Sequence, residues 1–113
     1  MGISTHILDT SLGRPAANVP VSLARAGENK RWVPLNQMVT DADGRCRSLL
    51  PEDEALTPGV YIVHFDTASY YEAQEVPGLY PYVQIVFTVE AGQAHYHIPL
   101  LLTANGYTTY RGT

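Results

Sequence analysis

The stretch AHYHIPLLLTANGYTTYRGT, residues 94–113, sets the pattern from which the fold of this chain can be predicted. Side chains two apart in a β-strand share a face, so Tyr96, Ile98 and Leu100 would face the core while His95 and His97 point the other way. The turn TANG, residues 103–106, separates this run from YTTYRGT, residues 107–113. The stretch therefore predicts two consecutive strands whose histidine-bearing face meets solvent or another subunit.

Apolar-rich runs of the same kind recur along the whole chain between turn signals, which is typical of an all-β sandwich or barrel. The predicted strands are residues 4–9, 19–25, 31–40, 45–50, 60–66, 82–90, 95–102 and 107–113. Pro34 indicates a sheet edge or a bulge, and DADG, residues 41–44, predicts a turn in which Gly44 takes a positive φ. The expected fold class is all-β, a two-sheet β-sandwich of about eight strands in a single domain, residues 1–113.

One segment breaks the strand period and predicts a short helix. In TASYYEAQEV, residues 67–76, Ser69 is followed three residues later by Glu72, the spacing of a capping box. The helix is expected to end before Pro77 and Gly78, which cannot continue it.

Composition excludes several classes of function. The net charge of −4 argues against nucleic acid as a partner, and no apolar run reaches the roughly 18 residues that span a membrane. Charged residues make up 16% of the chain, below the usual share of about a quarter, which predicts surface buried between subunits. Cys46 is the only cysteine, so it predicts a buried thiol in a reducing compartment rather than an internal disulfide.

Three polar residues stand out as candidates for chemistry, although their spacing does not bring them together. His97 and His95 share a strand face and could bind a metal, but no third ligand lies nearby in sequence, and two surface histidines are the plainer interpretation. His6 lies in the first predicted strand, and Arg45 directly follows the DADG turn. His64, opposite the apolar face of its strand, is expected to be exposed and inert.

Five segments, in order over nearly the whole chain, resemble the transthyretin-related 5-hydroxyisourate hydrolases. They are THILDTSLGRPA (5–16), TDADGR (40–45), FDTASYY (65–71), YPYVQIVF (80–87) and HYHIPLLL with YTTYRGT (95–102 and 107–113). The ending is the most specific part, since these enzymes typically end in Tyr-Arg-Gly-Ser. Thr113 departs from that serine, keeping the hydroxyl but adding a methyl group. Transthyretins proper share the fold but lack this ending and the histidines at positions 6 and 97.

The resemblance implies a prealbumin-like (transthyretin-like) sandwich that assembles as a homotetramer, a dimer of dimers, with active sites at the dimer–dimer interface. It implies catalytic and substrate-binding roles for His6, Arg45 and His97, substrate contacts from Tyr110 and Thr113, and no metal or cofactor. His95 matches a variable position and is expected to be accessory. Strand alternation places Thr113 on the opposite face from Tyr110, so the chain end must turn for Thr113 to reach the same site.

The implied reaction is hydrolysis of 5-hydroxyisourate to 2-oxo-4-hydroxy-4-carboxy-5-ureidoimidazoline, a step of urate (purine) catabolism towards allantoin. Two histidines can divide the acid and base roles, and arginine offers a fork of donors to carbonyl oxygens, but which histidine is the base stays open. A small-molecule carrier with an open channel and a scaffolding sandwich are the alternatives. A cytoplasmic location is expected, or a peroxisomal one if the source is eukaryotic, although the last three residues are not the Ser-Lys-Leu signal.

Overall fold

Two β-sheets face each other across one hydrophobic core in the computed structural model, which describes residues 2–113. The first, called here the β1–β8 sheet, contains β1 (Gly2–Asp9), β2 (Arg14–Pro15), β5 (Arg45–Cys46), β8 (His95–Thr103) and β9 (Gly106–Thr109). The second, the β3–β6 sheet, has the order β4 (Trp32–Val39), β3 (Pro20–Ala26), β6 (Gly59–Phe65) and β7 (Val83–Val89). A short 3-10 helix, η1 (Glu28–Lys30), lies in the β3–β4 hairpin. The predicted fold class, an all-β two-sheet sandwich with one short α-helix, is confirmed.

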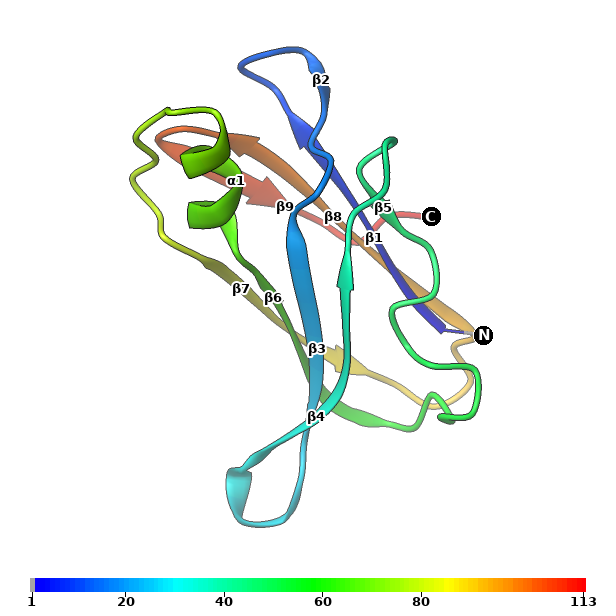
Figure 1. The fold of residues 1–113 in the computed structure, drawn as a ribbon. Coiled ribbons are helices and arrows are strands. Elements are labelled where there is room, and N and C mark those ends of the chain that lie inside the picture. Colours follow the sequence, from blue (N-terminus) through cyan, green and yellow to red (C-terminus); the bar gives the residue numbers. More distant parts are fainter. Residues whose placement is uncertain (1) are drawn as a thin grey trace.

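The helix α1 (Thr67–Ala73) closes one end of the sandwich, and the β3–β4 hairpin projects from the other (Figure 1). The Tyr70 hydroxyl donates to the buried Asp9 carboxylate at 2.7 Å, which ties the helix to the end of β1. The residue that caps the helix is Asp66, whose carboxylate accepts from the Ser69 backbone N–H at 3.1 Å. The predicted capping box from Ser69 to Glu72 is therefore wrong: the helix begins two residues earlier than Ser69, because the aspartate offers a cap first.

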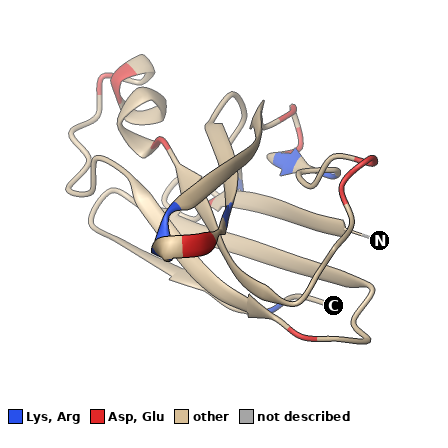
Figure 2. Ribbon diagram, turned by 90° about the horizontal axis from the view of Figure 1, so that it is seen from below, with Lys and Arg blue, Asp and Glu red and all other residues tan. Residues whose placement is uncertain are grey.

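Alternation along the strands sorts the core from the outer faces as expected. Tyr96, Ile98 and Leu100 of β8 are buried, and Tyr61, Val63 and Phe65 of β6 are buried against the core from the opposite sheet. Charged residues lie mostly in the loops and hairpins rather than on the strands (Figure 2). None of the helices formed within residues 2–113 is long and apolar enough to cross a membrane.

Two of the predicted strands are shorter than expected by more than one residue at an end. The strand predicted over residues 45–50 is reduced to Arg45–Cys46, because the chain then turns Leu49 and Leu50 into the core, with the Leu49 N–H donating to the Ile3 carbonyl at 2.9 Å. The strand predicted over residues 107–113 ends at Thr109. Beyond it, only Gly112 returns to the sheet, as an isolated bridge to His97.

The predictions made from Pro34, a sheet edge or bulge, and from Gly44, a turn with positive φ, are confirmed. β4, which contains Pro34, is one of the two edge strands of its sheet, and its register with β3 shifts between Leu23 and Ala24. Gly44 has a φ of +75°, and a Cβ at this position would collide with the carbonyl oxygen of Ile7. Only glycine fits this turn, which leads directly into Arg45.

Candidate active site

A groove of about 280 Å³ lies on the outer face of the β1–β8 sheet, away from the core. Three of the predicted site residues, Arg45, His97 and Thr113, line it together. The remaining lining residues are Ser4, Thr5, Arg47 and His95. The structure thus brings together residues that lie at opposite ends of the sequence.

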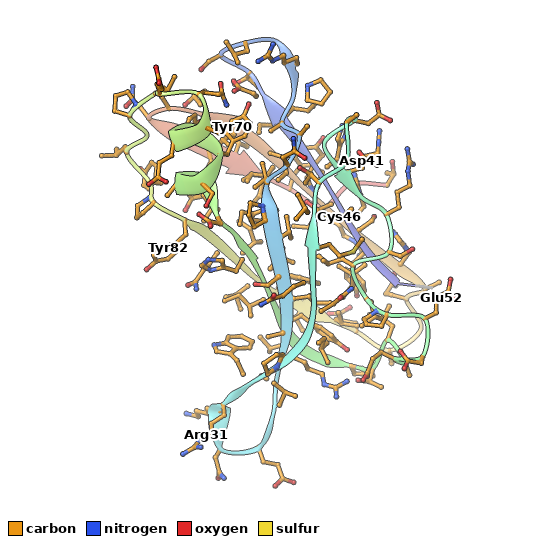
Figure 3. The ribbon with its side chains drawn as sticks, in the orientation of Figure 1. Arg31, Asp41, Cys46, Glu52, Tyr70 and Tyr82 are labelled. Carbon is orange, nitrogen blue, oxygen red and sulfur yellow. The ribbon has the colours of Figure 1, made fainter. Side chains whose placement is uncertain are left out.

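Arg45 is positioned by the turn that precedes it. The Asp41 carboxylate accepts from the backbone N–H groups of Asp43 and Arg45, each at 2.9 Å, and these bonds lower the pKa of Asp41. The Ile7 N–H donates to the Gly44 carbonyl at 2.7 Å, which fastens the turn to β1. Asp41 lies in this turn, with Cys46 on the short strand that follows (Figure 3). The anchored turn fixes the direction in which the half-buried Arg45 leaves the sheet.

His6 lies beside the groove rather than among the residues that line it. It pairs with Arg45 across β1 and β5, and with Pro99 across β1 and β8. Burial lowers the pKa of His6, and the positive charge of Arg45 lowers it further. His6 is therefore held mainly as the neutral imidazole near pH 7.

His97 lines the groove, and hydrogen bonds hold both its ring and its backbone. Its Nδ1 lies 2.8 Å from the Ser4 hydroxyl oxygen, and its carbonyl accepts from the Gly112 N–H at 2.8 Å. Burial lowers the pKa of His97, followed by the positive charge of Arg45 and then by His6 and His95. A neutral imidazole with one nitrogen engaged leaves Nε2 as the nitrogen available to a water molecule.

The last residues of the chain are held in place by Arg111. Its guanidinium carbon lies 4.1 Å from the centre of the Tyr96 ring, and its Nη2 donates to the Gln93 side-chain oxygen at 3.1 Å. Because β9 stops at Thr109, strand alternation no longer governs the end of the chain, and Thr113 reaches the groove beside His97. Thr113 thus lines the groove while Tyr110 lines a separate hollow, so the two residues do not share one site in the single chain.

Tyr110 is the predicted site residue that a single chain does not bring to the groove. It is 55% exposed and lines a separate hollow of about 280 Å³ with Ile85, Phe87 and Ile98 among others. Its predicted contact with substrate stays a prediction, one that would require assembly with another chain.

Gly112 packs directly under the His97 ring. A Cβ at residue 112 would lie 2.5 Å from Cδ2 of His97, closer than unbonded carbon atoms approach, and in tight contact at 3.3 Å with Cγ of Pro99. The Gly112→Ala variant must therefore push the ring of His97 aside or break the bridge between the two residues. We expect it to lower kcat about tenfold or more, since small displacements of reacting groups are costly.

The measurement is steady-state kinetics of Gly112→Ala beside a thermal melt. Gly106→Ala is the matched control, because a Cβ there would meet only the Thr103 hydroxyl oxygen at an ordinary 3.6 Å. Full activity in Gly112→Ala would show that the packing of this residue does not position His97.

Reasoning from sequence missed Ser4 and Arg47 as groove residues. Ser4 lies two residues before His6, so strand alternation places both on the same face and could have indicated it. Arg47 follows the end of β5, where no periodic pattern applies. His95, expected to be accessory, lines the groove as well.

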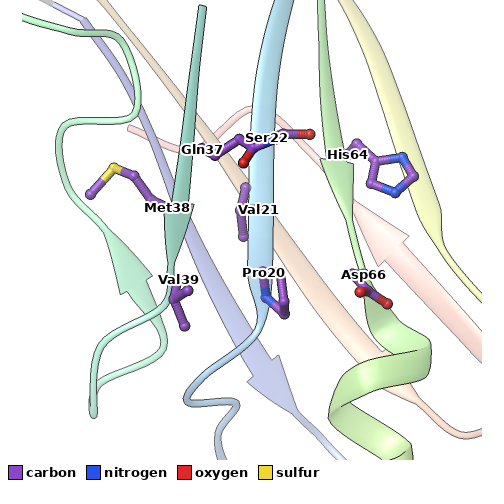
Figure 4. Close-up of a pocket in the computed structure, with 8 residues that line it drawn as sticks. All are labelled: Pro20, Val21, Ser22, Gln37, Met38, Val39, His64 and Asp66. Carbon is purple, nitrogen blue, oxygen red and sulfur yellow. The ribbon is translucent and has the colours of Figure 1, made fainter. Parts of the chain in front are cut away.

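A larger hollow of about 430 Å³ lies on the outer face of the β3–β6 sheet (Figure 4). It holds one histidine, His64, which is stacked on Tyr82 and lies within hydrogen-bonding distance of Gln84. Neither a second histidine nor an arginine lines it, so it lacks the chemistry of the groove. Over residues 2–113, no three His, Cys, Asp or Glu side chains are grouped so that they could hold a metal ion.

Two facing β-sheets with histidine and arginine side chains grouped on the outer face of one sheet define a β-sandwich with a candidate acid–base site. Residues 3–112 match the model of the HIUase/Transthyretin family, and the chain belongs to this family. It is 42% identical over 111 residues to a 5-hydroxyisourate hydrolase from Salmonella dublin, covering 98% of this chain and 80% of the relative.

Solved structures of both kinds of protein resemble this one. The structure of Klebsiella pneumoniae 5-hydroxyisourate hydrolase has a TM-score of 0.85 and 34% identity, with complete coverage of both chains. Sea bream transthyretin in complex with thyroxine has a TM-score of 0.92 and 31% identity, covering 99% of this chain and 95% of that one. Because backbone likeness does not separate the two functions, the side chains of the groove must decide between them.

Proposed function

We propose that this chain is an enzyme that hydrolyses 5-hydroxyisourate to 2-oxo-4-hydroxy-4-carboxy-5-ureidoimidazoline in urate degradation. The observation that carries the proposal is the groove in which His97, Arg45 and Thr113 meet beside His6. The hydrolase names of its relatives support the same activity. We further propose that residues 1–113 act as a single domain and that the protein works in the cytoplasm, where its single buried cysteine would stay reduced.

The groove offers each group that opening a cyclic ureide requires. His97 takes a proton from water at Nε2 as the water oxygen bonds to the ring carbonyl carbon. Arg45 donates to the oxygen on which negative charge develops, and the C–N bond then breaks as the leaving nitrogen takes a proton back from His97. His6 and Thr113 hold the substrate by hydrogen bonds. Every step is carried by side chains, and the proposal includes neither metal nor cofactor.

Incorporation of heavy oxygen tests this reaction directly. Substrate would be made in place from urate with urate oxidase and hydrolysed by the protein in water enriched in ¹⁸O. We expect one heavy oxygen in the new carboxylate of the product, detected by mass spectrometry, at a rate proportional to the amount of protein. A product without solvent oxygen would rule out attack of water on the carbonyl.

A carrier function is the second candidate, because the backbone is at least as similar to the thyroxine complex of sea bream transthyretin, with a TM-score of 0.92, as to the hydrolase structure, with 0.85. A carrier needs an open apolar channel, whereas the groove here is lined by two histidines and two arginines. Calorimetric titration with thyroxine separates the candidates: the hydrolase proposal expects no tight binding.

The pH dependence of activity follows from the lowered pKa values of His6 and His97. Protonation removes the base, so kcat/KM falls as the pH drops through the pKa of the essential histidine. Since that pKa lies below the ordinary 6.5, we expect the acid limb of the profile to have its midpoint below pH 6.5. A midpoint at or above pH 6.5 would contradict a neutral histidine base at this position.

We also propose a homotetramer, a dimer of dimers, with sites at the dimer–dimer interface and with Tyr110 contributing to the substrate site there. Apolar side chains left exposed on the edge strands support association, including Val86 of β7 and Tyr107 of β9, which are 57% and 42% exposed. Sedimentation velocity of the active protein is expected to give a species four times the 12.4 kDa chain mass. A fully active monomer would overturn this assembly.

A further inference from the structure

Ser4 lies between the two histidines of the groove and contacts both. Its hydroxyl oxygen is 2.8 Å from Nδ1 of His97 and 2.8 Å from Nε2 of His95. The parallel register of β1 and β8 creates this arrangement, since Ser4 is paired with His97 and Gly2 with His95. A hydroxyl has one proton to donate, so it can donate to only one of the two nitrogens and must accept an N–H from the other.

This single proton links the protonation of the two rings. When His97 carries its proton on Nδ1, Ser4 accepts from His97 and donates to an unprotonated Nε2 of His95. When Nδ1 of His97 is unprotonated, the chain of bonds reverses and His95 donates to Ser4. Moving one proton along each of the two hydrogen bonds converts the first state into the second.

We propose that Ser4 and His95 form a proton relay for His97. This inference rests on the proposed hydrolase function and adds two residues to it. As Nε2 of His97 takes the proton of the attacking water, the Nδ1 proton passes to the Ser4 oxygen and the Ser4 proton passes to Nε2 of His95. When Nε2 of His97 protonates the leaving nitrogen, both protons return, so that no proton is gained or lost by the relay.

The different surroundings of His97 and His95 favour proton transfer from His97 towards His95. His97 is half-buried and shares the groove with Arg45, and burial and the charge of Arg45 both disfavour a positive charge on its ring. His95 is the more exposed of the two rings in the single chain, and it shares the groove with Arg47. The relay therefore moves the transient positive charge from the more buried ring to the more exposed one.

Kinetics in weak and strong proton-accepting buffer test the relay. In dilute phosphate we expect His95→Ala to lose about tenfold in kcat, less than the 10²–10⁴-fold that removal of a general base costs. Added imidazole should restore His95→Ala, because a free imidazole can accept from Ser4, and it should leave the wild type unchanged after subtraction of the rate without enzyme. Ser4→Ala should fall similarly without recovery, and Ser4→Thr, which keeps the hydroxyl, should retain activity.

The matched control is His64→Ala, which replaces a histidine on the opposite sheet. Its kcat should equal that of the wild type both in dilute phosphate and with added imidazole. Wild-type kcat for Ser4→Ala and His95→Ala in dilute buffer would overturn the relay. Equal losses in Ser4→Thr and Ser4→Ala would also overturn it, because packing rather than the hydroxyl would then matter. A wild type without any activity would instead defeat the proposed function.

A second measurement does not depend on turnover. Nitrogen-15 NMR of the histidine rings distinguishes protonated from unprotonated nitrogens. We expect Nδ1 of His97 and Nε2 of His95 to be of opposite types in the neutral protein, and this correlation to disappear in Ser4→Ala. Finding both nitrogens unprotonated in the wild type would contradict the relay.

Discussion

His97→Asn is expected to lower kcat/KM for 5-hydroxyisourate by about 100-fold or more, because the substitution removes the base that takes the proton from water. The side chain is half-buried on the outer face of β8, so the fold should tolerate the change. Asparagine can still contact Ser4 and Gly112, which separates the loss of acid–base chemistry from the loss of packing. Initial rates of ultraviolet decay of the substrate provide the measurement.

His64→Asn is the control for this variant. His64 is also a histidine on the outer face of a sheet, but it lies in the hollow of the β3–β6 sheet with Gln84 and Tyr82. We expect it to keep full activity and an unchanged melting temperature. Equal activity of the two variants would remove His97 from the mechanism.

Arg45→Gln is expected to cost about two orders of magnitude in kcat, the usual loss when one donor to a developing oxyanion is removed. It also removes a positive charge that lowers the pKa values of His6 and His97. The acid limb of the pH profile should therefore move to higher pH while the maximal rate falls. Steady-state kinetics across the pH range measures both effects in one experiment.

Arg45→Lys separates the charge of the arginine from its shape. Lysine keeps the positive charge but lacks the planar fork of donors, so we expect a low rate with an acid limb close to that of the wild type. An Arg45→Gln profile with an unshifted acid limb would show that Arg45 does not set the protonation of the histidines.

The sequence alone predicts the parts of this protein that depend on local pattern. Alternation in β8 separates Tyr96, Ile98 and Leu100, which are buried, from His95 and His97 on the outer face. The DADG turn predicts a glycine with positive φ, and the structure confirms it. These features follow from the preferences of neighbouring residues, so a short stretch of sequence is enough to specify them.

The grouping of His6, Arg45 and His97 could not be derived from local pattern. It depends on the pairing of β1 with β5 and with β8, which joins residues some 90 positions apart, as in Ser4 with His97. Nor could the position of Thr113 be derived from alternation, which applies only while a strand continues, because β9 ends at Thr109. Resemblance to a family supplied the grouping that spacing could not.

The central claim is that this groove hydrolyses 5-hydroxyisourate, and the rate of substrate decay against protein concentration tests it most directly. Substrate generated by urate oxidase would be followed by its ultraviolet absorbance with increasing amounts of the protein and, in parallel, of His97→Asn. We predict a decay rate that rises in proportion to the wild-type concentration and stays near the spontaneous rate with the variant. A decay rate independent of the wild-type concentration would contradict the claim.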